Sequence, residues 1–302
     1  MSVILSIKQL SKSFGFIRAV NELSFEVNKG DVFGLLGPNG SGKTTTLGII
    51  LGVISPESGT YSWFGNPPDD KTRKKIGAIL ETPQFYPYLS GLKNLKILAD
   101  IKECKYDDID RVLKIVDLHD RKNHSYRNYS LGMKQRLGIA GALLCNPEVL
   151  ILDEPANGLD PQGISDIRKL ILRISEEGTT IILASHLLDE VQKTCSHVTI
   201  LDHGKNMYNG SVDAILSETP LIEISSDDLE KLFNALSNYT KIKSIYQEAD
   251  KVIIMLDEDS NSADINEYLF NNGVIVNHLC NRKKTLEKHF LQILAQSDDK
   301  TY

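Results

Sequence analysis

The chain has few cysteines and no long apolar run, and each shortage excludes a class of protein. Its 302 residues include four widely spaced cysteines without a C-x-x-C pair, so neither a disulfide framework nor a cysteine-rich zinc site is expected. Free thiols in a reducing cytosol are the simplest interpretation. No apolar run approaches the roughly 20 residues that a membrane-spanning helix needs. The sequence at 1–8 is too short and too soon charged for a signal peptide.

Positive charge is also in short supply. The chain carries 34 Lys and Arg against 40 Asp and Glu, a formal net charge of −6. This balance argues against nucleic acid as the main partner. With 41% hydrophobic residues the chain can bury a substantial core, and its length favours two domains.

A glycine-rich stretch at 37–45 fits the pattern G-x-x-x-x-G-K-[ST] of a phosphate loop. An apolar strand is expected before it at 31–36 and a helix after it at 45–51, which is the context that a chance glycine-rich turn would lack. Backbone N–H groups and the helix N-terminus would point at phosphates. We expect Lys43 to reach the β- and γ-phosphates and Thr44 to ligate Mg²⁺. The candidate phosphate-binding residues are Gly37, Pro38, Asn39, Gly40, Ser41, Gly42, Lys43, Thr44 and Thr45.

Two further strands are predicted to end in reactive side chains. The apolar strand at 149–152 is followed by Asp153, which could hold Mg²⁺, and Glu154, which could act as general base. His186 follows the next apolar strand, at 179–184, and would emerge at the same sheet edge. An acidic turn and a solvated histidine are the alternative interpretations. The phosphate loop upstream favours a catalytic pair and a γ-phosphate contact for His186.

The remaining patterns indicate an α/β fold with two added layers. Alternating residues at 3–9 and 23–27 predict an antiparallel β layer, with a loop at 12–15 that exposes an aromatic side chain. Apolar residues at helical spacing over 91–123, and a further helix at 130–145, predict a helical insertion between parallel strands.

The composition changes after about residue 217, where the order of expected elements becomes β-α-β-β-α-β. This order is typical of a ferredoxin-like module. We therefore expect a nucleotide-binding domain at 1–215, with a helical subdomain at about 88–145, and an accessory α+β domain at 216–302. The expected strands are 221–225, 242–247, 251–256 and 274–278, the expected helices are 226–239, 263–271 and 285–294, and 296–302 is expected to be a disordered tail.

Together these motifs resemble the ATP-binding subunit of an ATP-binding cassette (ABC) transporter. The matching motifs extend from Phe14 to His186. The family signature Leu-Ser-Gly-Gly-Gln falls on 129–133, where Tyr-Ser-Leu-Gly-Met keeps Ser130 and Gly132. The resemblance implies that the Ser130 hydroxyl and the Gly132 N–H donate to a γ-phosphate. It also implies that the loop ending at Asp160 is the family's D-loop, which crosses a dimer interface.

Two further positions take their roles from this resemblance. The family has Gln after the strand at 76–80, where it senses Mg²⁺ and faces the membrane subunit; here Glu81 stands in that place, with Gln84 as a rival. We prefer Glu81 because it directly follows the strand and because a carboxylate can also ligate Mg²⁺. Phe14 matches the aromatic that stacks on adenine, with a buried core position as the alternative. The stretch 81–91 most resembles bacitracin- and lantibiotic-export cassettes.

The resemblance implies an ABC-type phosphate-loop NTPase that hydrolyses Mg²⁺-bound ATP as a head-to-tail homodimer. It implies a separate membrane permease, export of a substrate, and a peripheral position on the cytoplasmic face of the membrane. A soluble ABC ATPase acting in DNA repair or translation is an alternative. Such proteins carry a long coiled-coil insertion or two cassettes in tandem, which this sequence lacks. A small-molecule kinase is a third possibility, but it would leave Ser130, Asp160 and His186 without a purpose.

Overall fold

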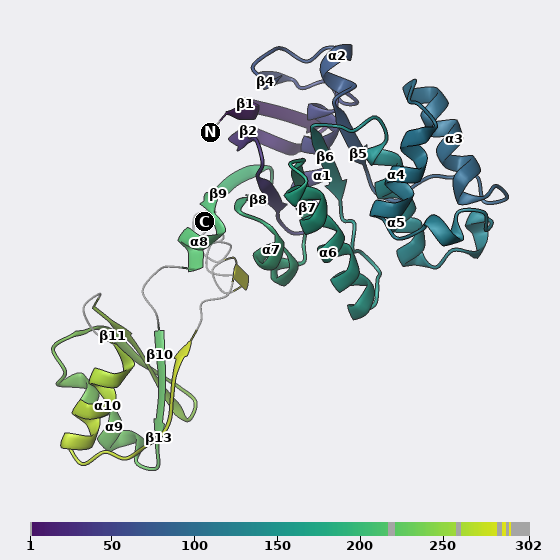
Figure 1. Ribbon diagram of the computed structural model, residues 1–302. Helices are drawn as coiled ribbons and strands as arrows, with labels where there is room; N and C mark the ends of the chain where they lie inside the picture. Colours follow the sequence, from purple (N-terminus) through teal and green to yellow (C-terminus); the bar gives the residue numbers. More distant parts are fainter. Residues whose placement is uncertain (1, 217–220, 258–260, 283–285, 288–289, 291–302) are drawn as a thin grey trace. The chain divides into compact units, whose positions relative to one another are not determined.

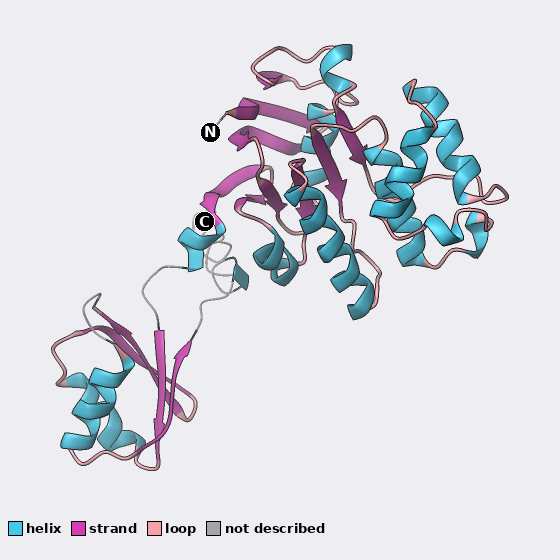
Figure 2. Ribbon diagram, in the orientation of Figure 1, coloured by secondary structure: helices cyan, strands magenta, loops and turns pink. Residues whose placement is uncertain are grey.

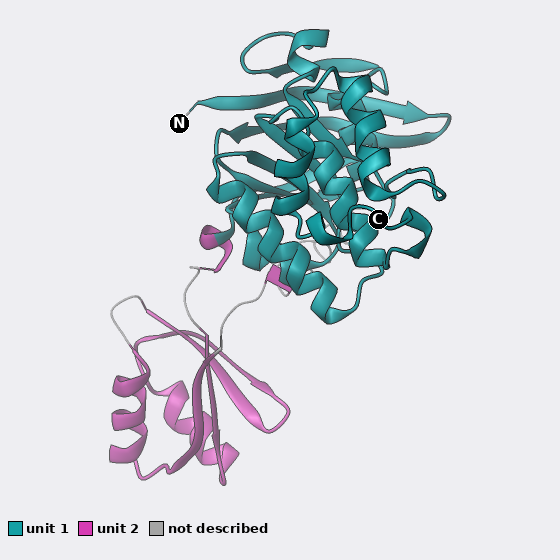
Figure 3. Cartoon of the chain, turned by 45° about the vertical axis from the view of Figure 1, so that its right-hand side comes forward, with its two compact units in different colours: residues 1–212, 293–302 teal, residues 213–292 magenta. Residues whose placement is uncertain are grey.

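The computed structural model describes residues 2–216, 221–257, 261–282, 286–287 and 290. The chain divides into two compact units, of which residues 1–212 form most of the first and 213–292 the second (Figure 3). The expected last helix lies mostly outside the described residues, and the expected tail lies entirely outside them. Within the described residues, every helix is too short or too polar to cross a membrane.

A six-stranded sheet organises the first unit, in the order β5-β6-β7-β3-β8-β9. Neighbouring strands pair in parallel from β5 to β8, and β9 closes the sheet as an antiparallel hairpin with β8. Every residue of β3, β6 and β7 is buried, which explains their nearly continuous apolar sequences. The strands are β3 (Val32–Leu36), β5 (Ile76–Ile79), β6 (Val149–Asp153), β7 (Thr180–Ser185), β8 (His197–Asp202) and β9 (Lys205–Ser211).

An antiparallel sheet of three strands packs against this layer, in the order β2-β1-β4. Its strands are β1 (Val3–Phe14), β2 (Ile17–Asn28) and β4 (Ser58–Trp63). The loop predicted at 12–15 is wrong, because β1 continues to Phe14, which pairs with Ile17. Register shifts and a left-handed residue, Gln9 at φ 48°, interrupt the simple alternation that the prediction used.

The helices of the first unit fall into two sets (Figures 1 and 2). One set, which includes α1, α6 and α7, packs beside the sheets, and the other, α3, α4 and α5, forms a separate group. One core cluster contains Leu5 of β1, Leu47 of α1 and Ile151 of β6. The separate group is the predicted helical insertion, and Leu95, Leu113 and Leu137 are fully buried in it. The helices are α1 (Lys43–Ile50), α2 (Asp70–Arg73), α3 (Gly91–Lys102), α4 (Asp107–Ile115), η1 (His119–Arg121), η2 (Tyr126–Asn128), α5 (Leu131–Leu143), α6 (Pro161–Glu176) and α7 (Leu188–Thr194). The short helix α8 (Val212–Leu216) marks the change from the first unit to the second.

The second unit has the predicted β-α-β-β-α-β order and a four-stranded antiparallel sheet, β11-β12-β10-β13. This is the ferredoxin-like arrangement. Ile222 and Ile224 of β10 pack with Leu232 of α9 and Leu269 of α10, so both helices cover one face. The elements are β10 (Leu221–Ser226), α9 (Leu229–Ser237), β11 (Ile242–Glu248), β12 (Lys251–Leu256), α10 (Ser262–Asn271) and β13 (Val276–Arg282). The last of these lies further along the chain than the predicted strand at 274–278.

The expectation of free thiols is wrong for two of the four cysteines. Cys104 and Cys145 form a disulfide, whereas Cys195 is free and buried and Cys280 is free and exposed. The chain separation of 41 residues hides this pairing in the sequence, but α3 and α5 end side by side and place the two Cα atoms 5.4 Å apart.

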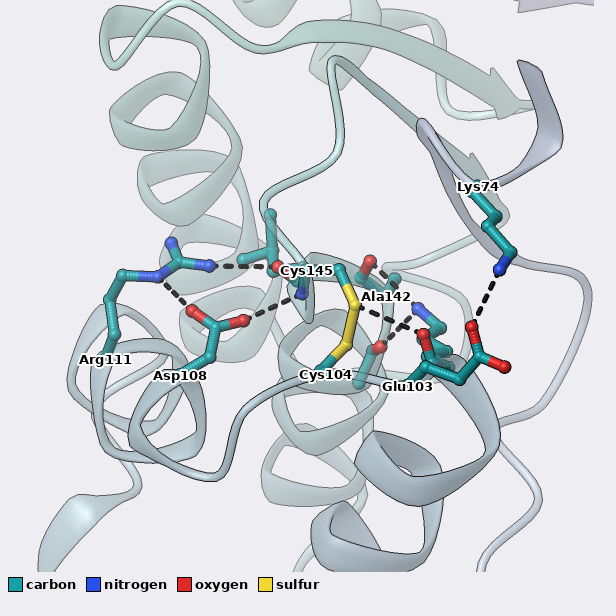
Figure 4. Close-up of a disulfide and its surroundings, with 10 residues drawn as sticks. Lys74, Glu103, Cys104, Asp108, Arg111, Ala142 and Cys145 are labelled. Carbon is teal, nitrogen blue, oxygen red and sulfur yellow. Dashed lines mark hydrogen bonds and ion pairs between the residues drawn. A yellow bond between two sulfur atoms is a disulfide. The ribbon is translucent and has the colours of Figure 1, made fainter. Parts of the chain in front are cut away.

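Polar contacts surround this disulfide at the C-terminal end of α5 (Figure 4). The Lys102 ammonium donates to the carbonyls of Gly141 (2.8 Å) and Ala142 (3.3 Å), and the Cys145 N–H donates to Asp108 at 2.7 Å. A cation at this position satisfies the last carbonyls of the helix. Burial lowers the pKa of Lys102 to about 8.

Candidate active site

The predicted phosphate loop lies between the end of β3 and the start of α1. Gly37, Gly40 and Gly42 all have positive φ, at 155°, 84° and 103°. A Cβ on Gly42 would lie 2.1 Å from the Ala19 carbonyl oxygen, so only glycine fits there. Gly42 caps α1 without a side-chain hydrogen bond, and the first turn of α1 carries no acidic residue. The N–H groups at this helix start therefore remain available for an anion.

Lys43 folds back across the loop that precedes it. Its side chain is only 6% exposed, and Nζ donates to the carbonyls of Gly37 (2.8 Å) and Pro38 (3.2 Å). The same ammonium lies 3.7 Å from Glu154 Oε1. The Ser41 hydroxyl is buried and has no hydrogen-bond partner among the described residues. The loop thus presents a cation and a spare hydroxyl around a concave backbone, as phosphate binding requires.

Thr44 and Asp153 come together although they are 109 residues apart in the chain. The Thr44 hydroxyl donates to Asp153 Oδ2 at 2.9 Å. Asp153 Oδ1 is buried and has no hydrogen-bond partner among the described residues. Burial chiefly raises the pKa of Asp153, and the negative charges of Glu154 and Glu81 add to this effect. An unpartnered carboxylate oxygen beside a hydroxyl and two more carboxylates is a donor set that fits Mg²⁺.

Glu154 and His186 meet at the carboxyl ends of the adjacent parallel strands β6 and β7. The Glu154 N–H donates to the Ala184 carbonyl at 2.9 Å, which fixes the residue at the strand end. Its Oε2 lies 2.8 Å from His186 Nδ1, and its backbone has a left-handed φ of 48°. Such a conformation is costly for a residue other than glycine, and it is common where a side chain must be aimed at a reacting group.

Glu81 and Gln84 have different surroundings. Glu81 follows β5 after one intervening residue, is exposed, and has a left-handed φ of 57°. Its charge is one of those that raise the pKa of Asp153. Gln84 instead turns back on its own loop, where its amide donates to the Thr82 carbonyl at 3.4 Å. The charge of Glu81 therefore acts on Asp153, whereas the Gln84 amide contacts its own loop.

The other predicted residues form a second group away from the phosphate loop. Ser130 is exposed and caps α5, with its hydroxyl accepting from the Met133 N–H at 3.3 Å, and Gly132 lies in the first turn. Asp160 caps α6 by accepting from the Gly163 N–H at 2.9 Å. A Cβ on Gly132 would lie 3.8 Å from Leu159, so the α5 start and the loop before α6 are neighbours. Among the described residues, no hydrogen bond or ion pair joins Ser130 or Gly132 to the phosphate loop.

Phe14 lies at the exposed end of β1. Its side chain is 51% exposed, and the Lys12 ammonium lies 5.5 Å from the ring centroid. The alternative that Phe14 is a core aromatic is therefore wrong. A planar ring in this exposed position is free to stack on a ligand.

The sequence did not indicate two residues, Ala19 and Gly204, whose backbones contact the phosphate loop. The Gly204 N–H donates to the Ser41 carbonyl at 3.0 Å, and the Gly204 carbonyl accepts from the Asn21 N–H at 2.8 Å. The Ala19 carbonyl lies directly beside the Cα of Gly42, which leaves no room for a side chain there. The only sequence signal was that Gly204 marks a hairpin turn, which indicates its conformation but not its contact with the loop.

Comparisons with known proteins agree with this geometry. Residues 20–157 match the family model described as ABC transporter. A bacitracin transport ATP-binding protein of Enterococcus faecalis is 34% identical over 98% of this chain and 97% of its own length. The chain belongs to the ABC transporter ATP-binding proteins. This ABC subunit is also 37% identical to a lantibiotic transport ATP-binding protein of Streptococcus pyogenes, over 76% of this chain and 96% of that protein.

Solved structures extend the comparison to the fold. The ABC transporter component cbiO1 of Clostridium perfringens has a TM-score of 0.66 and 30% identity, over 72% of this chain and 92% of its own. A dimeric bacterial ABC transporter cassette has a TM-score of 0.62 and 25% identity, over 69% of this chain and 99% of its own. The predicted family, subfamily resemblance and fold class are thereby confirmed. The protein is an ATP-hydrolysing subunit of an ABC transporter, and ATP and Mg²⁺ are its cofactors.

Proposed function

We propose that two copies of this ATPase form a head-to-tail dimer with two shared ATP sites. The observation that carries the proposal is the presence in one chain of two complementary but unconnected groups. The phosphate loop is linked to Asp153 and Glu154 by a hydrogen bond and an ion pair, whereas Ser130 belongs to a separate group. In a symmetric dimer, the Ser130 group of one copy would complete the site on the other.

Each residue has a role that follows from its contacts. The loop N–H groups and Lys43 would bind the phosphates, and Thr44, Asp153 and Glu81 would hold Mg²⁺. When bound, Mg²⁺ neutralises charge on the β- and γ-phosphates. Asp160, which caps α6 and directly follows Leu159, the neighbour of Gly132, would lie at the dimer interface. Phe14 would stack on the adenine through its exposed ring.

Glu154 is proposed as the general base. Its carboxylate would accept a proton from the attacking water. The hydrogen bond from His186 at 2.8 Å would orient that carboxylate, and His186 would also reach the γ-phosphate. Lys43, whose Nζ lies 3.7 Å from Glu154 Oε1, would hold this carboxylate near the γ-phosphate.

ATP would drive a cycle of closing and opening. Because each ATP would contact both copies, it would bind the closed dimer more tightly than the separated subunits, and this differential affinity would shift the population to the closed form. After hydrolysis the contacts through the γ-phosphate are lost, so the dimer would reopen.

We propose that the cycle exports a peptide antibiotic through a separate permease, with this subunit on the cytoplasmic face of the membrane. The names of the bacitracin and lantibiotic transport relatives support this cargo class. A groove of about 400 Å³ beside α3, lined mostly by apolar side chains, would receive a segment of the permease. It is lined by Gln84, Phe85, Tyr86, Asn94, Ile97, Leu98 and Ile101.

Affinity purification from detergent-solubilised membranes tests this proposal. The wild-type chain should recover a polytopic membrane protein, and Ile101→Glu should lose it, because a charge would enter the apolar groove. Val53→Glu is the matched control, because Val53 is equally exposed at 73% against 72% but does not line the groove. Recovery of ribosomes or DNA ends in place of a membrane protein would support the permease-free class and overturn the proposal.

A further inference from the structure

Three side chains with metal-binding donors gather on the second unit, on the face of the sheet opposite α9 and α10. Glu223 of β10 alternates with the core residues Ile222 and Ile224, so it points away from the helices. Cys280 of β13 pairs directly with Glu223, and His278 lies two residues before Cys280 on the same face. All three donor atoms lie within 4.8 Å of one another.

The contacts in this cluster converge on a single ring nitrogen. His278 Nε2 lies 2.9 Å from Glu223 Oε1 and 3.4 Å from Cys280 Sγ. One imidazole nitrogen either carries a proton or presents a lone pair, so it cannot donate to the carboxylate and accept from the thiol at the same time. A catalytic thiol–imidazole–carboxylate arrangement would instead place the thiol and the carboxylate on opposite ring nitrogens.

We propose that Glu223, His278 and Cys280 form a Zn²⁺ site in the second unit. A single cation can be bound by all three side chains at once, whereas His278 Nε2 can serve Glu223 and Cys280 together only by sharing one N–H between them. Ligands held tetrahedrally at Zn–N, Zn–O and Zn–S distances of about 2.0–2.3 Å lie roughly 3.3–3.6 Å apart. The two separations from His278 Nε2, 2.9 and 3.4 Å, need shifts of only a few tenths of an ångström. The ligand atoms of Glu223 and Cys280 lie within 4.8 Å of each other and would draw together on the ion.

The donor types select among metals. Imidazole nitrogen with thiolate sulfur favours Zn²⁺ over Mg²⁺ or Ca²⁺, which prefer oxygen ligands. Three protein ligands leave a fourth position for water. The His278 side chain is 41% exposed, so an ion can reach the site from solvent.

The charge of Lys251 opposes the binding of a metal ion. Its ammonium donates to Glu223 Oε1 at 2.6 Å and would repel a divalent cation. Removing this charge while keeping the length of the side chain should therefore tighten metal binding. A substitution that only disturbs the sheet would weaken metal binding. Tighter binding after removal of the Lys251 charge would therefore indicate a metal site.

The bound ion would stabilise the edge strand β13 by linking it to β10. β13 is the outer strand next to β10, and the ion would join the two strands through side chains. Because binding to the folded state alone stabilises it, Zn²⁺ should raise the melting temperature of the second unit. This site is independent of the ATP site, so either proposal can fail without the other.

Cobalt titration of the full chain tests the site. Without nucleotide or thiol reductant, so that Cys104 and Cys145 stay joined, the wild type should bind one Co²⁺ with a thiolate-to-cobalt charge-transfer band, and Zn²⁺ should abolish the band. Cys280→Ser should lose the band. His278→Ala and Glu223→Gln should each weaken cobalt binding by at least about tenfold. Loss of a residue that only supports a metal ligand already costs about that much, and loss of a direct ligand should cost no less. Lys251→Met should strengthen it.

The control is His124→Asn, because His124 is exposed and lies in the first unit. Its titration should match the wild type. Thermal unfolding with Zn²⁺ gives a second measurement that also verifies folding: the melting temperature should rise in the wild type and stay constant in Cys280→Ser. A wild type without a thiolate band, or a Cys280→Ser variant that keeps one, would overturn the proposal.

Discussion

Replacing Glu154 by glutamine isolates the proposed general base. The shape of the side chain is kept, but the charge that lies 2.8 Å from His186 and 3.7 Å from Lys43 is removed. Loss of a general base typically costs about 10²–10⁴ in rate. At about 1.4 kcal/mol per tenfold change, this is roughly 3–5 kcal/mol of transition-state stabilisation.

The assay is phosphate release at saturating Mg²⁺-ATP, together with equilibrium ATP binding. The rate should fall by the factor given above. Binding should change little, because Lys43, Thr44 and Asp153 are unchanged and the base acts in the transition state. Glu177→Gln is the matched control, since Glu177 is exposed at the end of α6. Turnover near the wild-type rate in Glu154→Gln would refute the assignment and make His186 the leading candidate.

Three further predictions concern the adenine contact and the helical group. Phe14→Ala should raise the KM for ATP about 5- to 150-fold with little change in kcat, because stacking on adenine contributes roughly 1–3 kcal/mol. An unchanged KM would show that Phe14 does not contact the nucleotide. Reducing the Cys104–Cys145 disulfide should lower the free energy of unfolding by about 4 kcal/mol, from the 41-residue separation. Denaturant curves that coincide with and without dithiothreitol would contradict this, and Cys104→Ser should be insensitive to the reductant. Because the folded pKa of Lys102 is lowered to about 8, the unfolded chain binds more protons between that value and its ordinary pKa. Wild-type stability should therefore rise relative to Lys102→Met as pH increases from 8 to 10, and a constant difference would exclude this burial effect.

The structure brings together the candidate phosphate-loop and acidic residues, as the sequence led us to expect, because their signals are local. Lys43 and Thr44 belong to one short motif, and Asp153 and Glu154 directly follow a wholly buried strand. Parallel pairing of β6 and β7 then brings His186 beside Glu154, as the sheet-edge argument predicted.

The features that the sequence did not predict depend on long-range contacts. The disulfide joins residues 41 apart because two helices end side by side. Gly204 supports Ser41 from 163 residues away through a backbone hydrogen bond, which leaves no trace in residue type. The strand β1 extends past its alternating segment because bulges shift the face on which its residues point.

The most direct test of the shared-site account is the ATP-dependent association of Glu154→Gln. In this variant unhydrolysed ATP should hold two copies together through Ser130 and Gly132. Size-exclusion chromatography should therefore give a dimer with Mg²⁺-ATP and a monomer with ADP. Adding Ser130→Arg to the same chain should return the ATP sample to a monomer, because a bulky cation would replace the exposed hydroxyl at the start of α5. A monomer in both nucleotides, or a dimer that ignores Ser130→Arg, would contradict the account.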